Sequence, residues 1–198
     1  MSYLDKTGLQ YLVNKIKNRV IPIDKGGTGV TTSLDAKKTL GIPRMGAWQL
    51  SSNIRLAEAN TNYEWNLEKC EGRYSLDLGG EYGMIDGNII YFDPLRSETR
   101  LVRVDICAYL MNGFKADSLV TTSLWIYSII TNSYTNTNTR WNARPPISAP
   151  YVHMAGSGFV KLSAGEGIQI RTNTTSGGGV IGRGIDTRVI LTDFGKIN

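Results

Sequence analysis

Residues 101–110, LVRVDICAYL, constrain the fold more than any other stretch of the sequence. Successive side chains of an extended strand point to opposite faces, so residues two positions apart share a face. One face of this stretch is wholly apolar and carries Val102, Val104, Ile106, Ala108 and Leu110. The other face carries Arg103, Asp105, Cys107 and Tyr109. The pattern predicts a strand with one face in a core and the other facing either solvent or a neighbouring subunit.

Short runs of this kind recur from residue 46 onward, separated by glycine, asparagine, serine and aspartate, which is typical of an all-β domain. Strands are predicted over 88–92, 123–130, 158–162, 167–172 and 187–194, with shorter pieces near 47–56, 62–68 and 73–78. Roughly eight to ten strands in about 150 residues suit a sandwich or jelly roll. Two stretches are predicted as loops, a long polar one at 131–146 and a mobile glycine-rich one at 176–186.

The N-terminal stretch TGLQYLVNKIKNRV, residues 7–20, carries a helix signature instead. Thr7 and Gln10 have the spacing of a capping box, and Pro22 ends the helix. An apolar seam two heptads long is formed by Leu9, Val13, Ile16 and Val20. A helix this short must bury its stripe, either on its own domain or against copies of itself. A second short helix is predicted from about Ser33 to Leu40, with Gly41 as its C′ glycine.

The glycine-rich stretch KGGTGVTT, residues 25–32, differs by one letter from a deviant Walker A phosphate-binding loop. Val30 stands where that loop needs its lysine, and Pro22 interrupts the segment where the preceding strand should lie. Nothing downstream alternates helix and strand, so the parallel sheet that such loops require is not expected. We therefore expect no nucleotide site, and the glycines permit the chain to turn between two helices.

Residues 21–42, IPIDKGGTGVTTSLDAKKTLGI, resemble the phage tail-fibre repeat with its "GGTGATT…A…NLG" core. The matching positions are Gly26, Gly27, Thr28, Gly29, Thr31, Thr32, Ala36, Leu40 and Gly41. Val30 replaces the usual alanine, and Thr39 stands where asparagine is frequent. The preceding YLDKTGLQYLVNKIK also looks like the opening of tail proteins from phages of Gram-positive bacteria.

Near the C-terminus, GFVKLSAGEGIQIRT is similar to a hairpin of the C1q/TNF-like jelly roll. The matching positions are Val160, Leu162, Ala164, Gly165, Ile168 and Ile170, while Glu166 replaces the usual aspartate. TRVILTDFG then resembles the closing strand of that fold. Both families form homotrimers, so the resemblance implies a mainly β, homotrimeric protein. It would have an N-terminal helical stalk at 1–22 for trimerisation and virion attachment, a glycine-rich neck with a short helix at 23–45, and a jelly-roll head at 46–198.

Composition excludes several classes of function. The net charge of +5 would permit an acidic partner, but no run of lysine and arginine exceeds two residues, so we expect no nucleic-acid binding. No stretch is long enough for a membrane span, and the N-terminus lacks a signal-peptide layout, so synthesis in a cytoplasm without a cleaved leader is expected. Cys70 and Cys107 are expected to be reduced thiols.

Catalysis is not expected, nor is any metal or cofactor. The single histidine, His153, is followed by Gly-Ser-Gly without a G-x-S-x-G elbow, and no Cys/His spacing suits zinc. We expect His153 to pack on the sandwich or face solvent. The carboxylates that cluster in sequence are expected to be ordinary solvated groups; they are Glu64, Glu68, Asp77, Glu81 and Asp86.

A sugar site needs an aromatic platform and a few polar groups, and the 131–146 stretch offers both. Tyr134 and Trp141 could stack on a sugar, and its hydroxyls could be bonded by Asn138, Arg140 and Asn142. Alternatively, Trp141 caps the edge of the sandwich. The other tryptophans, Trp48, Trp65 and Trp125, are expected in the core or at an interface.

The resemblances together imply a virion protein assembled in the cytoplasm of a host bacterium. The expected function is a trimeric fibre head that adheres to host cell-wall or capsular carbohydrate, with the N-terminal helix joining other virion proteins. The alternative is a structural head-fibre or collar decoration of the same architecture without a specific glycan ligand.

Overall fold

The computed structural model describes residues 36, 40–71, 82–111, 113–145 and 151–197. The predicted helical seam of Leu9, Val13, Ile16 and Val20 and the strand predicted near 73–78 lie outside these residues. At the end of the predicted second helix, the Leu40 amide donates to the Ala36 carbonyl at 3.0 Å. Gly41 follows with a φ of +64°, the left-handed conformation that a C′ glycine adopts, as predicted.

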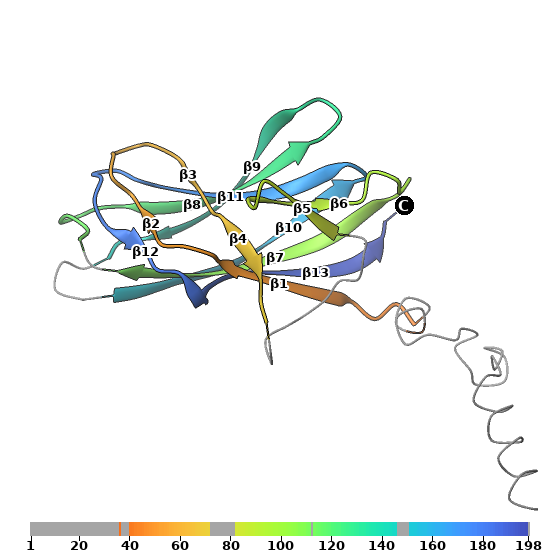
Figure 1. Cartoon of the computed structure of the whole chain (residues 1–198), viewed down its shortest axis with the longest axis horizontal. Helices are drawn as coiled ribbons and strands as arrows, with labels where there is room; N and C mark the ends of the chain where they lie inside the picture. Colours follow the sequence, from red (N-terminus) through yellow and green to blue (C-terminus); the bar gives the residue numbers. More distant parts are fainter. Residues whose placement is uncertain (1–35, 37–39, 72–81, 112, 146–150, 198) are drawn as a thin grey trace, which may run out of the picture. The chain divides into compact units, whose positions relative to one another are not determined.

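Residues 44–198 form a compact unit, and its described residues build two antiparallel sheets (Figure 1). Sheet A contains β1 (Arg44–Leu50), β2 (Ile54–Arg55), β4 (Leu67–Lys69), β7 (Thr99–Met111), β10 (Tyr151–Ser163), β12 (Val180–Ile181) and β13 (Gly184–Lys196). Sheet B contains β3 (Tyr63–Glu64), β5 (Tyr82–Ile85), β6 (Ile89–Phe92), β8 (Val120–Ser128), β9 (Ser133–Ala143) and β11 (Glu166–Thr174). The mainly β prediction is confirmed.

The strand order within each sheet departs from the order along the chain. In sheet A, β10, β7, β13, β1 and β4 lie side by side in that order, so the first strand of the head pairs with the last. In sheet B the order is β5, β6, β11, β8, β9. The strand predicted over 101–110 is the centre of β7, and its apolar face is buried against sheet B as expected; the core includes Val102, Val104, Ile106, Ala108 and Leu110.

The prediction of a long loop at 131–146 is wrong. Residues 133–143 form strand β9, which pairs with β8 across a turn at residues 129–132. Asn132 takes a φ of +49° in that turn. β9 lies at the edge of sheet B, where most of its side chains face solvent. Its threonines suit a strand, while its asparagines gave the stretch the composition of a loop.

The glycine-rich stretch at 176–186 is not a free loop either. It contains β12 and the start of β13, and its backbone forms hydrogen bonds with both the amide and the carbonyl of Leu56. The Gly178 amide donates to the Leu56 carbonyl at 2.6 Å, and the Leu56 amide donates to the Gly179 carbonyl at 3.1 Å. Gly178 and Gly179 have φ values of +82° and +86°, so glycine is needed for this close pairing of backbones.

A buried ion network fixes the point where β1 begins. Asp193, near the end of β13, is buried, and its Oδ2 accepts from Arg44 Nη2 and from Arg100 Nη1, each at 2.7 Å. Its Oδ1 accepts from the Gly195 amide at 2.8 Å. Arg100 also pairs with Glu98, and its guanidinium lies 5.1 Å from the centre of the Phe92 ring. The network therefore ties β1, β7 and β13 together at one end of sheet A.

Cys70 and Cys107 are free thiols, as expected. Cys70 follows β4, and Cys107 lies on β7, three strands away in sheet A. Three strand spacings of about 4.8 Å separate them by roughly 14 Å, whereas a disulfide requires α-carbons within about 7 Å. Burial raises the pKa of both thiols, and the Arg188 guanidinium partly opposes this.

Both cysteines should therefore react slowly with a disulfide reagent at pH 8, since a raised pKa leaves little of the reactive thiolate. We expect each to react at least about tenfold more slowly in the folded protein than in urea. Absorbance of the released thiol measures this. Reaction of the folded protein at the rate of the unfolded chain would contradict the burial of these side chains.

Candidate functional surfaces

The five residues predicted to bind a sugar all lie on β9, but the strand divides them between two faces. Tyr134, Arg140 and Asn142 project from the outer face of sheet B, and the Tyr134 side chain is 40% exposed. Asn138 is exposed at an irregularity in the pairing with β8, with a φ of +62°. The Asn142 side chain accepts a hydrogen bond from Thr121 at 2.8 Å.

Trp141 is not a sugar platform, because it points into the sandwich and is only 8% exposed. It lies opposite the buried Thr122 on β8, on the inner face of the sheet. Its indole covers Gly156 on β10, where an added Cβ would lie 1.8 Å from Cδ1 of the indole. It therefore caps the gap between the β9 and β10 edges. The alternative interpretation of Trp141 as an edge cap is the one that the structure supports.

The outer face of sheet B carries a set of rings that we call the aromatic surface: Trp125 and Tyr127 on β8, and Tyr134 on β9. Tyr127 lies directly opposite Tyr134, and their ring centres are 4.9 Å apart. Trp48 and Trp65 are buried in the core as expected, whereas Trp125 is half-buried on this outer face.

Arg171 of β11 lies between two of these rings. Its guanidinium carbon is 4.6 Å from the centre of the Trp125 ring and 4.3 Å from that of Tyr134. Its Nη2 is 3.2 Å from Oε1 of Glu64, and its Nε donates to the side-chain oxygen of Gln169. These contacts hold the guanidinium against both rings, which fixes the ring orientations.

Polar side chains complete this surface around Glu64, which was predicted to be an ordinary solvated carboxylate. Glu64 lies on β3 opposite Arg171, and its Oε2 accepts from Nδ2 of Asn88 at 2.6 Å. Within the described residues, two covered atoms next to this ion pair have no hydrogen-bond partner: Nε2 of Gln169 and Oδ1 of Asn88. The first is a donor and the second an acceptor.

The outer face of sheet A exposes two clusters of rings, one near the start of β10 and one near its end. Near the start of β10, the Tyr109 ring centre lies 5.5 Å from that of Tyr151 and 5.1 Å from that of His153. Near its end, the Phe159 and Phe194 ring centres are 6.1 Å apart. Tyr151 is 54%, Phe159 58% and Phe194 44% exposed. His153 thus packs on the sandwich and also faces solvent.

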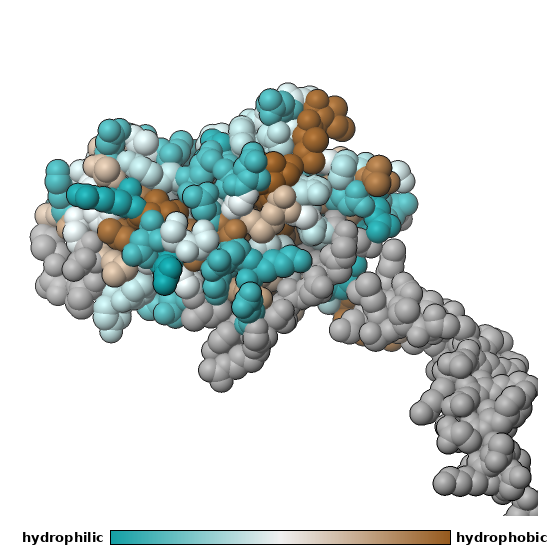
Figure 2. Space-filling view, in the orientation of Figure 1, coloured by the Kyte–Doolittle hydropathy of each residue, from teal (hydrophilic) through white to brown (hydrophobic). Residues whose placement is uncertain are grey.

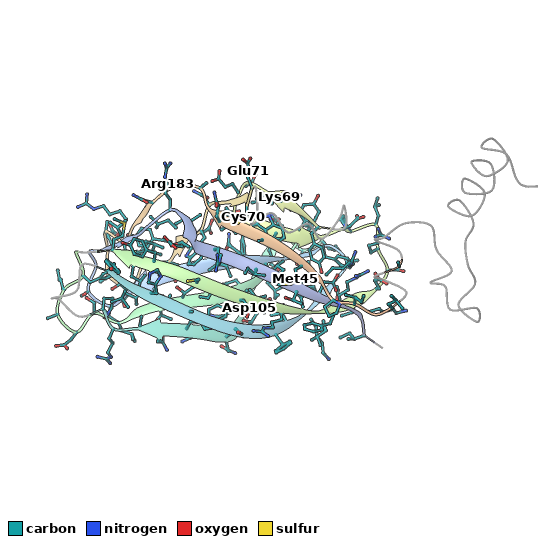
Figure 3. The ribbon with its side chains drawn as sticks, turned by 90° about the horizontal axis from the view of Figure 1, so that it is seen from below. Met45, Lys69, Cys70, Glu71, Asp105 and Arg183 are labelled. Atoms are coloured by element: carbon teal, nitrogen blue, oxygen red, sulfur yellow. The ribbon has the colours of Figure 1, made fainter. Side chains whose placement is uncertain are left out.

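Between these two ring clusters the same face is polar. Arg103 forms an ion pair with Asp105 at 2.8 Å and donates to the Ser157 hydroxyl at 3.2 Å. Figure 3 looks onto sheet A and marks Asp105 on β7 and Met45 on β1. The face is therefore a mixed surface, with apolar rings at two points and a charged pair between them.

The part of the chain that the structure describes contains no helix long and apolar enough to cross a membrane. Nor do the described histidine, cysteine, aspartate and glutamate side chains gather in a group of three that could hold a metal ion.

Comparison of the sequence with protein-family profiles and with curated proteins finds no match. The fold, however, has counterparts among solved structures. Eiger TNF from S. frugiperda is similar with a TM-score of 0.56 and 8% identity, over 79% of this chain and 95% of that one. Murine APRIL at pH 8.0 is similar with a TM-score of 0.54 and 10% identity, over 78% of this chain and 99% of that one. The head is therefore a TNF-like jelly roll, which confirms the fold predicted from the C-terminal hairpin.

Proposed function

We propose that this chain is a trimeric bacteriophage fibre protein whose head adheres to carbohydrate on the host cell surface. The resemblance of residues 21–42 to the tail-fibre repeat supports the virion assignment. The TNF-like jelly roll supports the trimer, because the resemblance at 158–172 is to a family of homotrimers. The N-terminal segment joins the head to other virion proteins, and the head binds rather than cleaves its ligand.

The observation that most strongly supports the proposed trimer is the pair of exposed ring clusters on sheet A. Tyr151, Phe159 and Phe194 are each more than two-fifths exposed although they sit on regular strands. Aromatic side chains of this size contribute strongly to subunit interfaces, and the polar Arg103–Asp105 pair between them supplies orientation. In a closed ring of three copies, the face of one chain packs on a different face of the next.

Trimerisation also explains how a weak sugar site becomes useful. Sheets A and B form opposite layers of the sandwich. In the proposed trimer, the outer face of sheet A packs on an edge of the next sandwich, so the outer face of sheet B stays uncovered in every subunit. Three equivalent sites then bind one cell surface with the avidity of linked sites.

Light scattering during size-exclusion chromatography tests the assembly. Three chains of 21.8 kDa give about 65 kDa. The double substitution Phe159→Asp and Phe194→Asp should lower the mass to that of one chain, because it places two carboxylates in each apolar contact. Leu95→Asp is the control, because Leu95 is 91% exposed in the connection between β6 and β7, outside the strands of sheet A. Figure 2 shows that the tip of the β8–β9 hairpin, where Ile130 is 83% exposed, is also apolar. A wild-type monomer would contradict the proposal.

Adhesion is tested with the labelled trimer on susceptible host cells. The proposal predicts labelling that purified wall or capsular polysaccharide competes away. A trimer that ignores the cells while purified virion parts bind its N-terminus would instead identify a structural decoration. Release of reducing ends from the polysaccharide would identify an enzyme.

A further inference from the structure

We propose that the outer face of sheet B binds a neutral hexopyranose residue, with Trp125 and Tyr134 as the stacking platform and the Glu64–Arg171 pair as its polar edge. This inference rests on the proposed adhesion to carbohydrate and replaces the site centred on Trp141. It places the site on four strands, β3, β8, β9 and β11, instead of on one loop.

The platform is organised before any ligand arrives. Arg171 contacts both rings at 4.6 and 4.3 Å, and Tyr127 supports Tyr134 from the neighbouring strand. A sugar that stacks on a ring held in this way immobilises few further side-chain torsions, which is a main cost of binding at exposed surfaces. Because the guanidinium of Arg171 lies over one face of each ring, the sugar stacks on ring surface that Arg171 does not cover, and Tyr134 remains 40% exposed. There the weakly positive C–H groups of a pyranose complement the negative face of the ring.

The polar edge offers both kinds of hydrogen-bonding group. Glu64 accepts from Arg171 and Asn88 while its side chain remains 40% exposed, so its carboxylate can accept from a further hydroxyl. The Gln169 donor and the Asn88 acceptor adjoin the pair without partners among the described residues. Leaving a covered polar group without a partner is costly, and a hydroxyl or bridging water, which donates and accepts, satisfies both types.

The charge of the site favours a neutral sugar. Arg171 is compensated by Glu64 at 3.2 Å, so its guanidinium is already paired. Arg140 lies on the same outer face, on β9 opposite Ser123, and takes no part in the platform. Binding of a neutral hexopyranose should therefore depend neither on Arg140 nor on the salt concentration. Binding of an acidic sugar or a phosphate should require the charge of Arg140 and weaken as salt is added.

The test uses the trimer on an immobilised panel of neutral and acidic oligosaccharides at 50 and 300 mM salt. We expect binding to neutral hexopyranose members at both salt concentrations. Tyr134→Ala should weaken it at least tenfold, Tyr134→Phe should retain it, and Arg140→Gln should leave it unchanged. Circular dichroism and light scattering confirm that each variant remains a folded trimer.

Several outcomes would overturn the inference. They are binding restricted to acidic members, loss of binding in Arg140→Gln, and no effect of Tyr134→Ala. The host-cell assay separates this failure from failure of the proposed function. Cells labelled equally by the wild type and by Tyr134→Ala would retain adhesion and reject this site. Susceptible cells that the wild type does not label would reject adhesion itself, while the panel still decides whether the aromatic surface binds neutral sugars.

Discussion

Replacing Asp193 with alanine should lower the free energy of unfolding by about 3 to 5 kcal/mol, because it removes the buried carboxylate that two buried guanidinium groups share. Arg44 and Arg100 both donate to the same oxygen of Asp193 at 2.7 Å, and both are buried. Arg100 retains Glu98, but Arg44 loses the carboxylate to which it is bonded. Urea denaturation at fixed protein concentration measures the change.

Arg96→Ala is the control for that experiment. Arg96 lies 3.7 Å from Asp93 in a solvent-exposed ion pair, so its loss should cost under about 1 kcal/mol. If Asp193→Ala also costs less than about 1 kcal/mol, the network is not the element that holds β1, β7 and β13 together.

Gly156→Ala should destabilise the head by about 3 kcal/mol, since the added methyl group would lie 1.8 Å from the Trp141 indole. Trp141→Ala should cost about 3 to 5 kcal/mol by itself, because it opens the gap between β9 and β10. In the double variant the methyl group meets no indole, so the cost of Gly156→Ala should largely disappear.

A double-mutant cycle by urea denaturation measures this coupling. Costs that simply add would show that the indole moves away from Gly156 without loss, and the capping role of Trp141 would be rejected. Glycan binding in Trp141→Ala should follow the fraction of folded trimer, because the indole faces the core.

The sequence predicts the centre of the fold better than its edges. Alternation over 101–110 identifies β7 and its buried face, because a strand in a two-layer sandwich has one face in the core and one face outside it. The composition of β9 instead predicts a loop, because an edge strand can be polar over most of its length. Trp141 points inward because it lies opposite Thr122 on β8, and the local composition of β9 does not reveal that pairing.

The sequence predicts only part of the candidate sugar surface, because strand pairing cannot be read from local composition. Tyr134 was identified as a platform residue, but Arg171, Glu64 and Asn88 come from strands that only the register of sheet B brings together. The available signal was the alternation of Trp125 with Tyr127 and of Gln169 with Arg171, two pairs that mark outward faces of neighbouring strands. Without the register, that signal does not show which strands are neighbours.

The position of β1 has a mechanical consequence for the fibre proposed above. The strand begins at Arg44 and pairs along its length with β13, so a pull directed along it from the preceding chain loads the whole ladder in shear. In that geometry the hydrogen bonds must break together instead of one after another. The Arg44–Asp193 ion pair stands at the first rung, where such a pull is applied. In the proposed fibre, a head held at the cell surface would therefore offer its greatest resistance to a pull that is directed along β1.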